Sequence, residues 1–96
     1  MVVTMVEARI DEGRRDEVVA AYRELLAEGL PPYLAETFLL SDEGSDMWRI
    51  VTVWRDRTQL EALRASGETP PAQAVFLAAG GQPTVAVFEV VEQAAG

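Results

Sequence analysis

Few side chains in this sequence are able to carry chemistry, and several of the usual kinds are missing. The chain has no histidine, cysteine, lysine or asparagine, and all eight of its basic residues are arginines. A Ser-His-Asp triad, a Cys-His pair, a disulfide, a zinc finger and an iron–sulfur site are therefore excluded. Lysine Schiff-base chemistry is excluded as well. Any reaction must use carboxylates, arginines, hydroxyls, aromatic rings or the reactivity of the substrate itself.

Two residues are candidates for catalysis. Trp54 ends a β-branched stretch, where it could form an aromatic wall against a planar substrate, or could simply fill the core. Arg64 follows Leu60 by four residues, so it borders the packed face of a predicted helix. From there it could hold an enolate, a phenolate or a carboxylate. The alternative is a solvated arginine paired with Glu61 or Glu68, which would contribute little stability.

A second set of residues could bind and orient a substrate. The predicted substrate-binding residues are Tyr22, Tyr33, Phe38, Trp48 and Thr52. Tyr22 lies on the inward face of a predicted helix and Tyr33 follows a Pro-Pro bend, so each phenol could bind a ligand or merely pack. Thr4 and Thr52 share strand parity with Val6 and Trp54, which would direct both hydroxyls into a pocket. As β-branched residues, they also suit a strand without any function.

The remaining charged residues indicate neither a metal nor a nucleotide. One group shares a strand parity and is expected on the sheet face away from the helices: Glu7, Arg9, Arg49 and Glu89, alongside Val51, Val53, Val85 and Val87. An ion-pair network is expected there, with a polar site as the alternative. The acidic loop 42–46 lacks the full ligand set of a calcium loop. Gly80-Gly81 follows a helix, unlike a nucleotide-binding fingerprint. We expect no metal and no cofactor.

The apolar pattern predicts the element order βαββαβ. Strands are expected over residues 2–10, 33–41, 47–55 and 84–92, with helices over 14–28 and 57–66 and a short extra helix over 72–79. Polar turns that contain Gly or Pro separate these elements. The order is typical of an α+β ferredoxin-like fold, in which one antiparallel sheet carries its helices on one face. Residues 1–96 are expected to form a single domain.

The second face of this sheet is predicted to be covered by another copy of the chain. In the third strand, Trp48 and Ile50 alternate with Val51 and Val53, so both faces are substantially apolar. A half-solvated antiparallel sheet would instead alternate apolar and polar residues. We therefore expect a homodimer in which two sheets meet face to face, as a dimeric α/β barrel.

With these elements in place, the chain resembles the antibiotic biosynthesis monooxygenase family of dimeric α/β-barrel proteins. The resemblance covers nearly the whole chain: the strand 2–10 leading into Gly13, the bend 30–33, and the stretch 48–63. That stretch has the family's strand ending in Trp, followed by a short polar turn and a leucine-led helix. The resemblance implies a cofactor-independent monooxygenase for a quinol, phenol or polyketide-like aromatic, with Trp54 lining the pocket. The deprotonated substrate would reduce dioxygen itself.

Two positions depart from the haem-degrading branch of that family. That branch has a His ten residues after the Trp and an Asn seven residues before the glycine that precedes the first helix. Arg64 and Val6 occupy these positions here, so the resemblance does not imply haem degradation. The alternative function is a non-catalytic small-molecule-binding or accessory protein on the same scaffold. A lyase or isomerase of a related barrel would commonly need a histidine.

The charge balance bears on partners and location. With 16 acidic and 8 basic residues, the formal net charge is -8, which disfavours nucleic acid and anionic membranes. No apolar run approaches the ~20 residues that span a bilayer. The segment 1–7 lacks the basic region of a signal peptide. We expect a cytoplasmic protein with no nucleic-acid or membrane partner.

Overall fold

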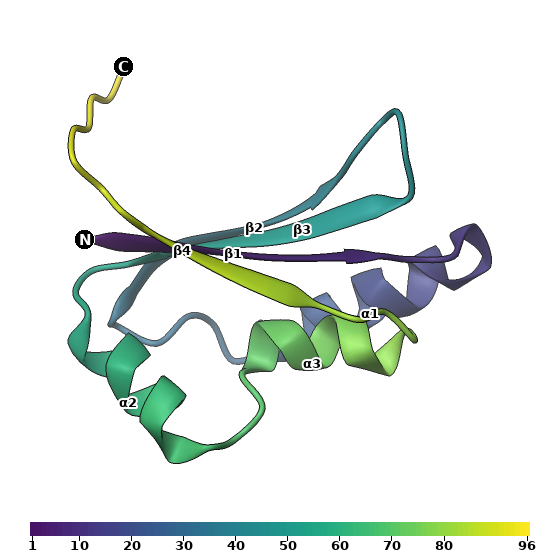
Figure 1. Ribbon diagram of the computed structural model, residues 1–96, viewed down its shortest axis with the longest axis horizontal. Helices are drawn as coiled ribbons and strands as arrows, with labels where there is room; N and C mark the ends of the chain where they lie inside the picture. The colour runs from purple at the N-terminus through teal and green to yellow at the C-terminus, as the bar shows by residue number, and fades with distance from the viewer.

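The computed structural model describes residues 1–96 and contains one sheet and one layer of helices. Its elements are, in chain order, β1 (Val2–Arg9), the 3-10 helix η1 (Glu12–Arg14), α1 (Arg15–Leu25), β2 (Leu34–Ser41), β3 (Met47–Trp54), α2 (Thr58–Ser66), α3 (Pro71–Ala78) and β4 (Thr84–Glu89). The four strands pair antiparallel in the order β2-β3-β1-β4. All three α-helices lie on one side of the sheet (Figure 1). This is the ferredoxin-like α+β fold predicted above.

The ends of the elements differ from the predicted ones for local reasons. Helix α1 ends at Leu25, and a turn closes it by a hydrogen bond from the Gly29 N–H to the Leu26 carbonyl. Gly29 has a φ of 84°, a left-handed conformation that glycine adopts readily. Strand β4 ends at Glu89 rather than 92. Its last contact with the sheet is the hydrogen bond from Val90 N–H to the Met1 carbonyl, beyond which the chain runs away from the sheet (Figure 1).

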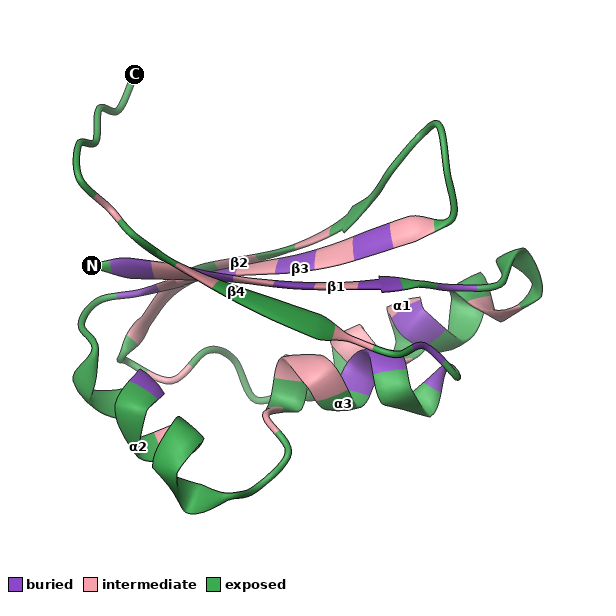
Figure 2. Ribbon diagram, in the orientation of Figure 1, coloured by how far each residue is buried: buried purple, intermediate pink, exposed green.

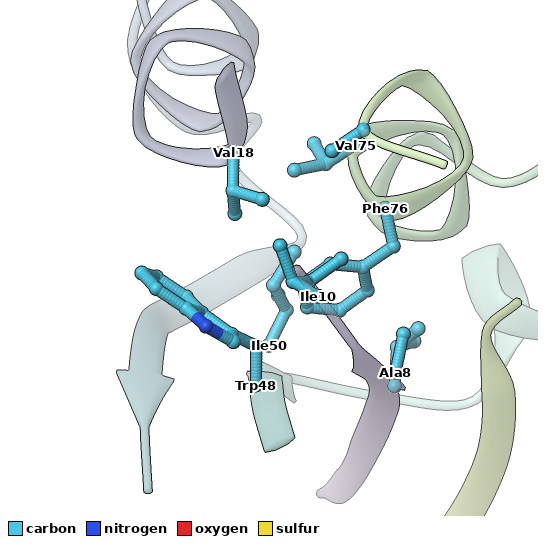
Figure 3. Close-up of a cluster of buried hydrophobic side chains, with 9 residues drawn as sticks. Ala8, Ile10, Val18, Trp48, Ile50, Val75 and Phe76 are labelled. Carbon is cyan, nitrogen blue, oxygen red and sulfur yellow. The ribbon is translucent and has the colours of Figure 1, made fainter. Parts of the chain in front are cut away.

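The main core lies under α1 and α3. Its members are apolar and buried: Val6, Ala8, Ile10, Val18, Trp48, Ile50, Val75, Phe76 and Ala79. Figure 3 shows Phe76 of α3 reaching over Ile10, with Val18 of α1 and Trp48 of β3 closing the cluster. A smaller cluster of Val2, Trp54 and Leu60 lies at the other end of the sheet. The alternation of buried and less buried residues along β3 is visible in Figure 2.

The pairing of β4 with β1 shows that one prediction was wrong, namely that Val85, Val87 and Glu89 lie on the sheet face away from the helices. Val85 and Val87 lie opposite Val6 and Thr4 of β1, and Glu89 lies opposite Val2. Residues paired directly across an antiparallel ladder share a face, so these three residues belong to the helix-facing side rather than to the open face. The sequence of β4 alone could not decide its parity, because both of its alternating sets are largely apolar.

The face away from the helices is apolar and uncovered in the single chain. Its residues include Phe38, Leu40 and Phe88, each more than 40% exposed, and the half-buried Met5 and Val51. Figure 2 shows the exposure of β4.

One ion pair of the predicted network lies on this open face. Arg49 Nε is 2.8 Å from Glu7 Oε2, and the two residues are direct cross-strand partners. Arg9 instead pairs with Asp46 of the β2–β3 loop, at 2.6 Å. The network is therefore smaller than predicted, with Glu7 and Arg49 as the members that meet.

Gly81 is expected to be intolerant of a side chain. A Cβ at this position would lie 2.8 Å from Ile10 Cδ1 and 3.2 Å from both Ala8 Cβ and the Phe76 carbonyl oxygen. Ile10 is buried and has little room to move. We expect Gly81→Ala to lower the free energy of unfolding by about 1–3 kcal/mol through overpacking, as measured by urea denaturation.

Gly13→Ala is the matched control, because an added Cβ there meets no heavy atom within 4 Å. Its free energy of unfolding should stay within about 1 kcal/mol of the parent value. Equal unfolding midpoints for the two variants would contradict the tight packing at Gly81.

Candidate functional site

The candidate site is a cavity at the Trp54 end of the sheet, between the strands and the chain segments that cross beneath them. Its volume is about 730 Å³, within the range of small-molecule sites. The strands form the floor, α2 and the loop before α3 form one side, and the segment after α1 forms another. About half of the lining residues are hydrophobic, among them Leu34, Leu60, Leu63, Val85 and Val87. The cavity therefore suits a mainly apolar ligand.

An aromatic pair stands on one side of this cavity. The ring centroids of Tyr33 and Trp54 are 5.9 Å apart and the planes make an angle of 20°, an offset stack. Trp54 is buried, whereas Tyr33 is 37% exposed. Arg55 holds the bend before β2 in place, because its N–H donates to the Tyr33 carbonyl and its Nε to the Pro32 carbonyl. The predicted wall at Trp54 is thus a two-ring wall that includes Tyr33.

The floor of the cavity carries a row of three threonines. Thr4, Thr52 and Thr37 come from β1, β3 and β2 and are direct partners in the strand register. Trp54 Nε1–H donates to Thr4 Oγ1 at 3.0 Å, and Thr52 Oγ1 lies 3.4 Å from Thr37 Oγ1. The Tyr22 hydroxyl reaches Thr37 Oγ1 at 3.3 Å. Three threonine hydroxyls and an indole N–H therefore form a polar strip across an otherwise apolar surface, and the Tyr22 hydroxyl contacts this strip from outside the lining.

The bulge in β2 explains why Thr37 was not predicted and where Phe38 lies. The register shifts between Leu34 and Glu36, so Leu34 faces Trp54 whereas Thr37 faces Thr52. A bulge of this kind exchanges the faces of all later residues in the strand. It turns Thr37 into the cavity and Phe38 to the open face, opposite Val51. Phe38 is therefore not brought to the candidate site.

Trp48 is also separate from the cavity. It is 5% exposed within the main core, and the Arg15 guanidinium carbon lies 5.0 Å from its ring centroid, a cation–π contact. Trp48 and Trp54 share the helix-facing side of β3, as predicted, but α1 and α3 cover the Trp48 end. Strand parity gave the correct face, although it did not locate the cavity along the strand.

Arg64 lies at the exposed rim of the cavity and makes the predicted contact with Glu61. It lines the cavity, and its Nη1 is 3.5 Å from Glu61 Oε1. Arg57 Nη1 also approaches Glu61 Oε1, at 3.7 Å. A single carboxylate therefore serves two guanidinium groups, which leaves one net positive charge on this edge of α2. All three side chains are about half exposed, so the pairs contribute little stability.

The titratable residues of the lining are confined to the rim. They are Glu28, Tyr33, Arg64 and Glu68, and all four are exposed. The buried part of the lining holds hydroxyls and apolar groups. No group of three or more His, Cys, Asp or Glu residues is placed to hold a metal ion, and none of the helices is both long and apolar enough to cross a membrane.

The sequence model of the antibiotic biosynthesis monooxygenase family matches residues 1–75, which include the aromatic wall, the threonine row and Arg64. The chain belongs to this family. No curated protein matches it in sequence.

Solved structures agree with the assignment at the level of the fold. An antibiotic biosynthesis monooxygenase is 20% identical, with a TM-score of 0.69 and coverage of 96% of this chain and 100% of that one. SnoaB, a cofactor-independent oxygenase from Streptomyces nogalater, is 16% identical as a mutant, with a TM-score of 0.64 and coverage of 96% and 94%. A mutant of MhuD with two manganese protoporphyrin IX molecules per active site is 19% identical, with a TM-score of 0.69 and full coverage of both chains. At such identities, the likeness establishes the fold alone.

The residues of this family member do not fit a haem. Val6, at the position where the haem-degrading branch has an Asn, is buried in the main core beside Ile50. Arg64, at the position of the His, is a cation at the rim. Neither side chain offers the neutral nitrogen that binds haem iron or the amide that accompanies it.

Helix α2 forms one side of the cavity and depends on few apolar anchors. Leu60 is its one buried residue and packs with Val2 and Trp54, with Leu63 half-buried beside them. We expect Leu60→Ala to cost about 2–5 kcal/mol of unfolding free energy and to accelerate hydrogen exchange of the α2 amides. Arg64→Gln should change stability by less than about 0.5 kcal/mol. Unchanged exchange in Leu60→Ala would contradict this anchoring.

Proposed function

We propose that this chain is a cofactor-independent monooxygenase whose substrate is a planar phenol, quinol or polyketide-like aromatic. Membership of the antibiotic biosynthesis monooxygenase family supports monooxygenase activity in general. The observation that carries the substrate class is the stacked Tyr33–Trp54 pair on an apolar cavity of about 730 Å³. A flat aromatic ligand matches such a wall better than a flexible aliphatic one, since it packs against aromatic rings with little loss of conformational entropy.

The proposed reaction uses the substrate as its own reductant. Loss of a proton from an activated ring CH₂ or phenol gives an electron-rich anion, which passes an electron to dioxygen. The resulting radical pair combines into a peroxide, and the peroxide loses water. For an activated CH₂ the balance is R₂CH₂ + O₂ → R₂C=O + H₂O, so one oxygen atom enters the product and the other leaves as water. No external electron donor is required.

In this proposal, the side chains at the cavity orient the substrate and stabilise its anion. Trp54 and Tyr33 hold the ring plane, and Thr52 bonds the ligand from the floor. Tyr22 acts through Thr37 as a positioning residue, because its hydroxyl contacts that threonine. The Arg64 guanidinium stabilises the substrate anion from the rim.

The proton acceptor must be found without a histidine. The carboxylates of Glu28 and Glu68 are the candidates, because they line the same rim as Arg64. A carboxylate can act as a general base for a phenol or an activated CH₂ whose own acidity is raised by a nearby cation.

Oxygen consumption tests the enzymatic proposal directly. With anthrone-like phenols and hydroquinones as substrates, Trp54→Phe and Arg64→Gln are each expected to lower kcat/KM by about tenfold, the effect of losing a contact to a charged or stacked substrate. Arg57→Gln is the matched control, since it also pairs with Glu61 but lies outside the cavity lining. It should keep kcat/KM within about twofold of the parent value. A parent protein that binds these aromatics but consumes no oxygen with any of them would contradict catalysis.

A non-catalytic small-molecule-binding or accessory role is the second candidate function. The observation that favours it is the buried lining, which contains no titratable side chain. Such a site can recognise a ligand by stacking and hydrogen bonding while lacking a buried acid or base. Ligand binding without turnover in the oxygen assay is the outcome this role predicts.

We also propose that a second copy of the chain covers the open face of the sheet. Phe38, Leu40 and Phe88 are exposed there beside Met5 and Val51, and a contiguous apolar face on a small protein marks an interaction site. Because the same strands carry the threonine row on their other face, pairing of two sheets would also stiffen the cavity floor.

Light scattering at micromolar concentration tests this assembly. The parent protein is expected at twice the 10.5 kDa chain mass. Phe38→Glu should shift it toward a single chain, because a charge would be buried between the sheets. Leu77→Glu, on an exposed residue of α3 in the helix layer, should leave the mass unchanged. A parent protein of one chain mass would overturn the homodimer.

A further inference from the structure

We propose that the threonine row is a binding site for a ligand oxygen, a carbonyl or phenolate on the buried edge of the aromatic substrate, and that two hydroxyl protons on the floor donate to it. The inference rests on the proposed function, in that it takes the cavity as the substrate site. It adds which edge of the substrate enters first and which chemical group that edge must carry.

The indole of Trp54 determines that the Thr4 hydroxyl oxygen acts as the acceptor in their hydrogen bond. An indole N–H can only donate, so the 3.0 Å contact between Trp54 Nε1 and Thr4 Oγ1 makes the threonine oxygen the acceptor. The Thr4 hydroxyl proton makes no hydrogen bond with any other protein atom in the structure. With its oxygen held by the indole, Thr4 has its own proton free to donate toward the cavity that it lines.

The other two threonines supply a second proton, which belongs to Thr52 when Thr37 is the donor of their shared hydrogen bond. Tyr22 donates to Thr37 Oγ1, and one hydroxyl of the Thr37–Thr52 pair donates to the other. In the orientation that serves a ligand, Thr37 accepts from Tyr22 and donates to Thr52, which leaves the Thr52 proton free. The two contacts, at 3.3 and 3.4 Å, are long for O–H···O hydrogen bonds. Because these contacts are weak, the pair can present the Thr52 proton to a ligand oxygen at little cost.

The two donors are close together and shielded from water. Thr4 and Thr52 are direct partners on adjacent strands, an arrangement that places Cβ atoms about 4.5–5.5 Å apart. Their side chains share the helix-facing side, and the residues are 6% and 7% exposed. Two hydroxyls at that spacing can bracket one ligand oxygen. Hydrogen bonds in such a dry setting are stronger than at the surface.

The free hydroxyl protons of Thr4 and Thr52 define the chemistry of the ligand. A carbonyl or phenolate oxygen accepts two hydrogen bonds and so matches the two free hydroxyl protons of the floor. At the other end of the cavity, the rim carries Arg64 together with the carboxylates of Glu28 and Glu68. The ligand that fits this cavity has an oxygen acceptor on its buried edge, and an acidic group on its outer edge can be placed only at Arg64.

Anthraquinone-2-sulfonate and anthracene-2-sulfonate are a suitable pair of probes. They share three fused rings and one sulfonate and differ in two carbonyl oxygens. The chain contains neither cysteine nor lysine, so no side-chain thiol or amine can add to the quinone. Titration calorimetry should give a tighter Kd for anthraquinone-2-sulfonate by about fivefold, the effect of one net hydrogen bond.

Threonine variants identify the donors. Thr52→Val and Thr4→Val keep the side-chain shape and should each weaken anthraquinone-2-sulfonate by about fivefold, while anthracene-2-sulfonate changes by less than about twofold. Thr4→Ser and Thr52→Ser restore the hydroxyl and should restore the carbonyl preference. Thr84→Val, on the opposite face of the sheet, is the matched control. Thr52→Val and Thr52→Ser decide the matter if Thr4→Val, which leaves the indole N–H unpaired, fails to fold.

The outcomes separate this inference from the proposed function. Equal binding of the two probes by the parent protein, or equal weakening of both in the valine variants, overturns the donor floor and leaves an aromatic site in place. Binding of neither probe overturns the aromatic site and the donor floor together. A carbonyl preference that the valine variants lose and the serine variants regain supports the inference, whether or not oxygen is consumed.

Discussion

The register of β1 in the middle of the sheet is the constraint on which the rest of the molecule depends. Val2, Thr4 and Val6 of this strand lie opposite Trp54, Thr52 and Ile50 of β3, and opposite Glu89, Val87 and Val85 of β4. A slip of one residue would exchange the two faces of the strand. It would expose the main core and break the contact between Trp54 and Thr4. The core, the cavity and the open face thus follow from one alignment of strands.

Along the helix-facing side, this alignment places a polar row between two apolar clusters. Val6 and Ile50 begin the main core beneath α1 and α3, whereas Val2 and Trp54 join Leu60 of α2 in the smaller cluster. Thr4 and Thr52 lie between these pairs. The main core is filled by two helices, while the other end is covered by α2 with a single buried leucine. A cavity persists where covering is sparse and where the floor has hydroxyls whose hydrogen-bonding capacity is not used within the protein.

The sequence predicted the elements and the helix-facing residues of β1 and β3, because the opposite set of each strand carries charged residues, Glu7 and Arg9 in β1 and Arg49 in β3. It failed where alternation was ambiguous or interrupted. In β4 both sets are apolar, so Val85 and Val87 were assigned to the wrong face. In β2 the bulge after Leu34 reversed the parity of Thr37 and Phe38. Such a bulge depends on how β2 meets the end of β3, a non-local pairing that local sequence patterns do not contain.

The lack of a histidine determines which polar groups the cavity can present to a ligand. A buried imidazole would supply a charge that changes with pH, whereas the floor here offers hydroxyl donors whose number is constant over the physiological range. Such donors stabilise a developing oxyanion by position, with no proton transfer of their own. Charge is instead placed at the exposed rim, where Arg64 shares Glu61 with Arg57. The proposed function places proton removal at the rim and the further proposal places oxygen recognition at the floor, at different ends of the cavity. A site divided in this way would require a substrate long enough to reach both ends, and the fused-ring aromatic of the proposed function meets that requirement.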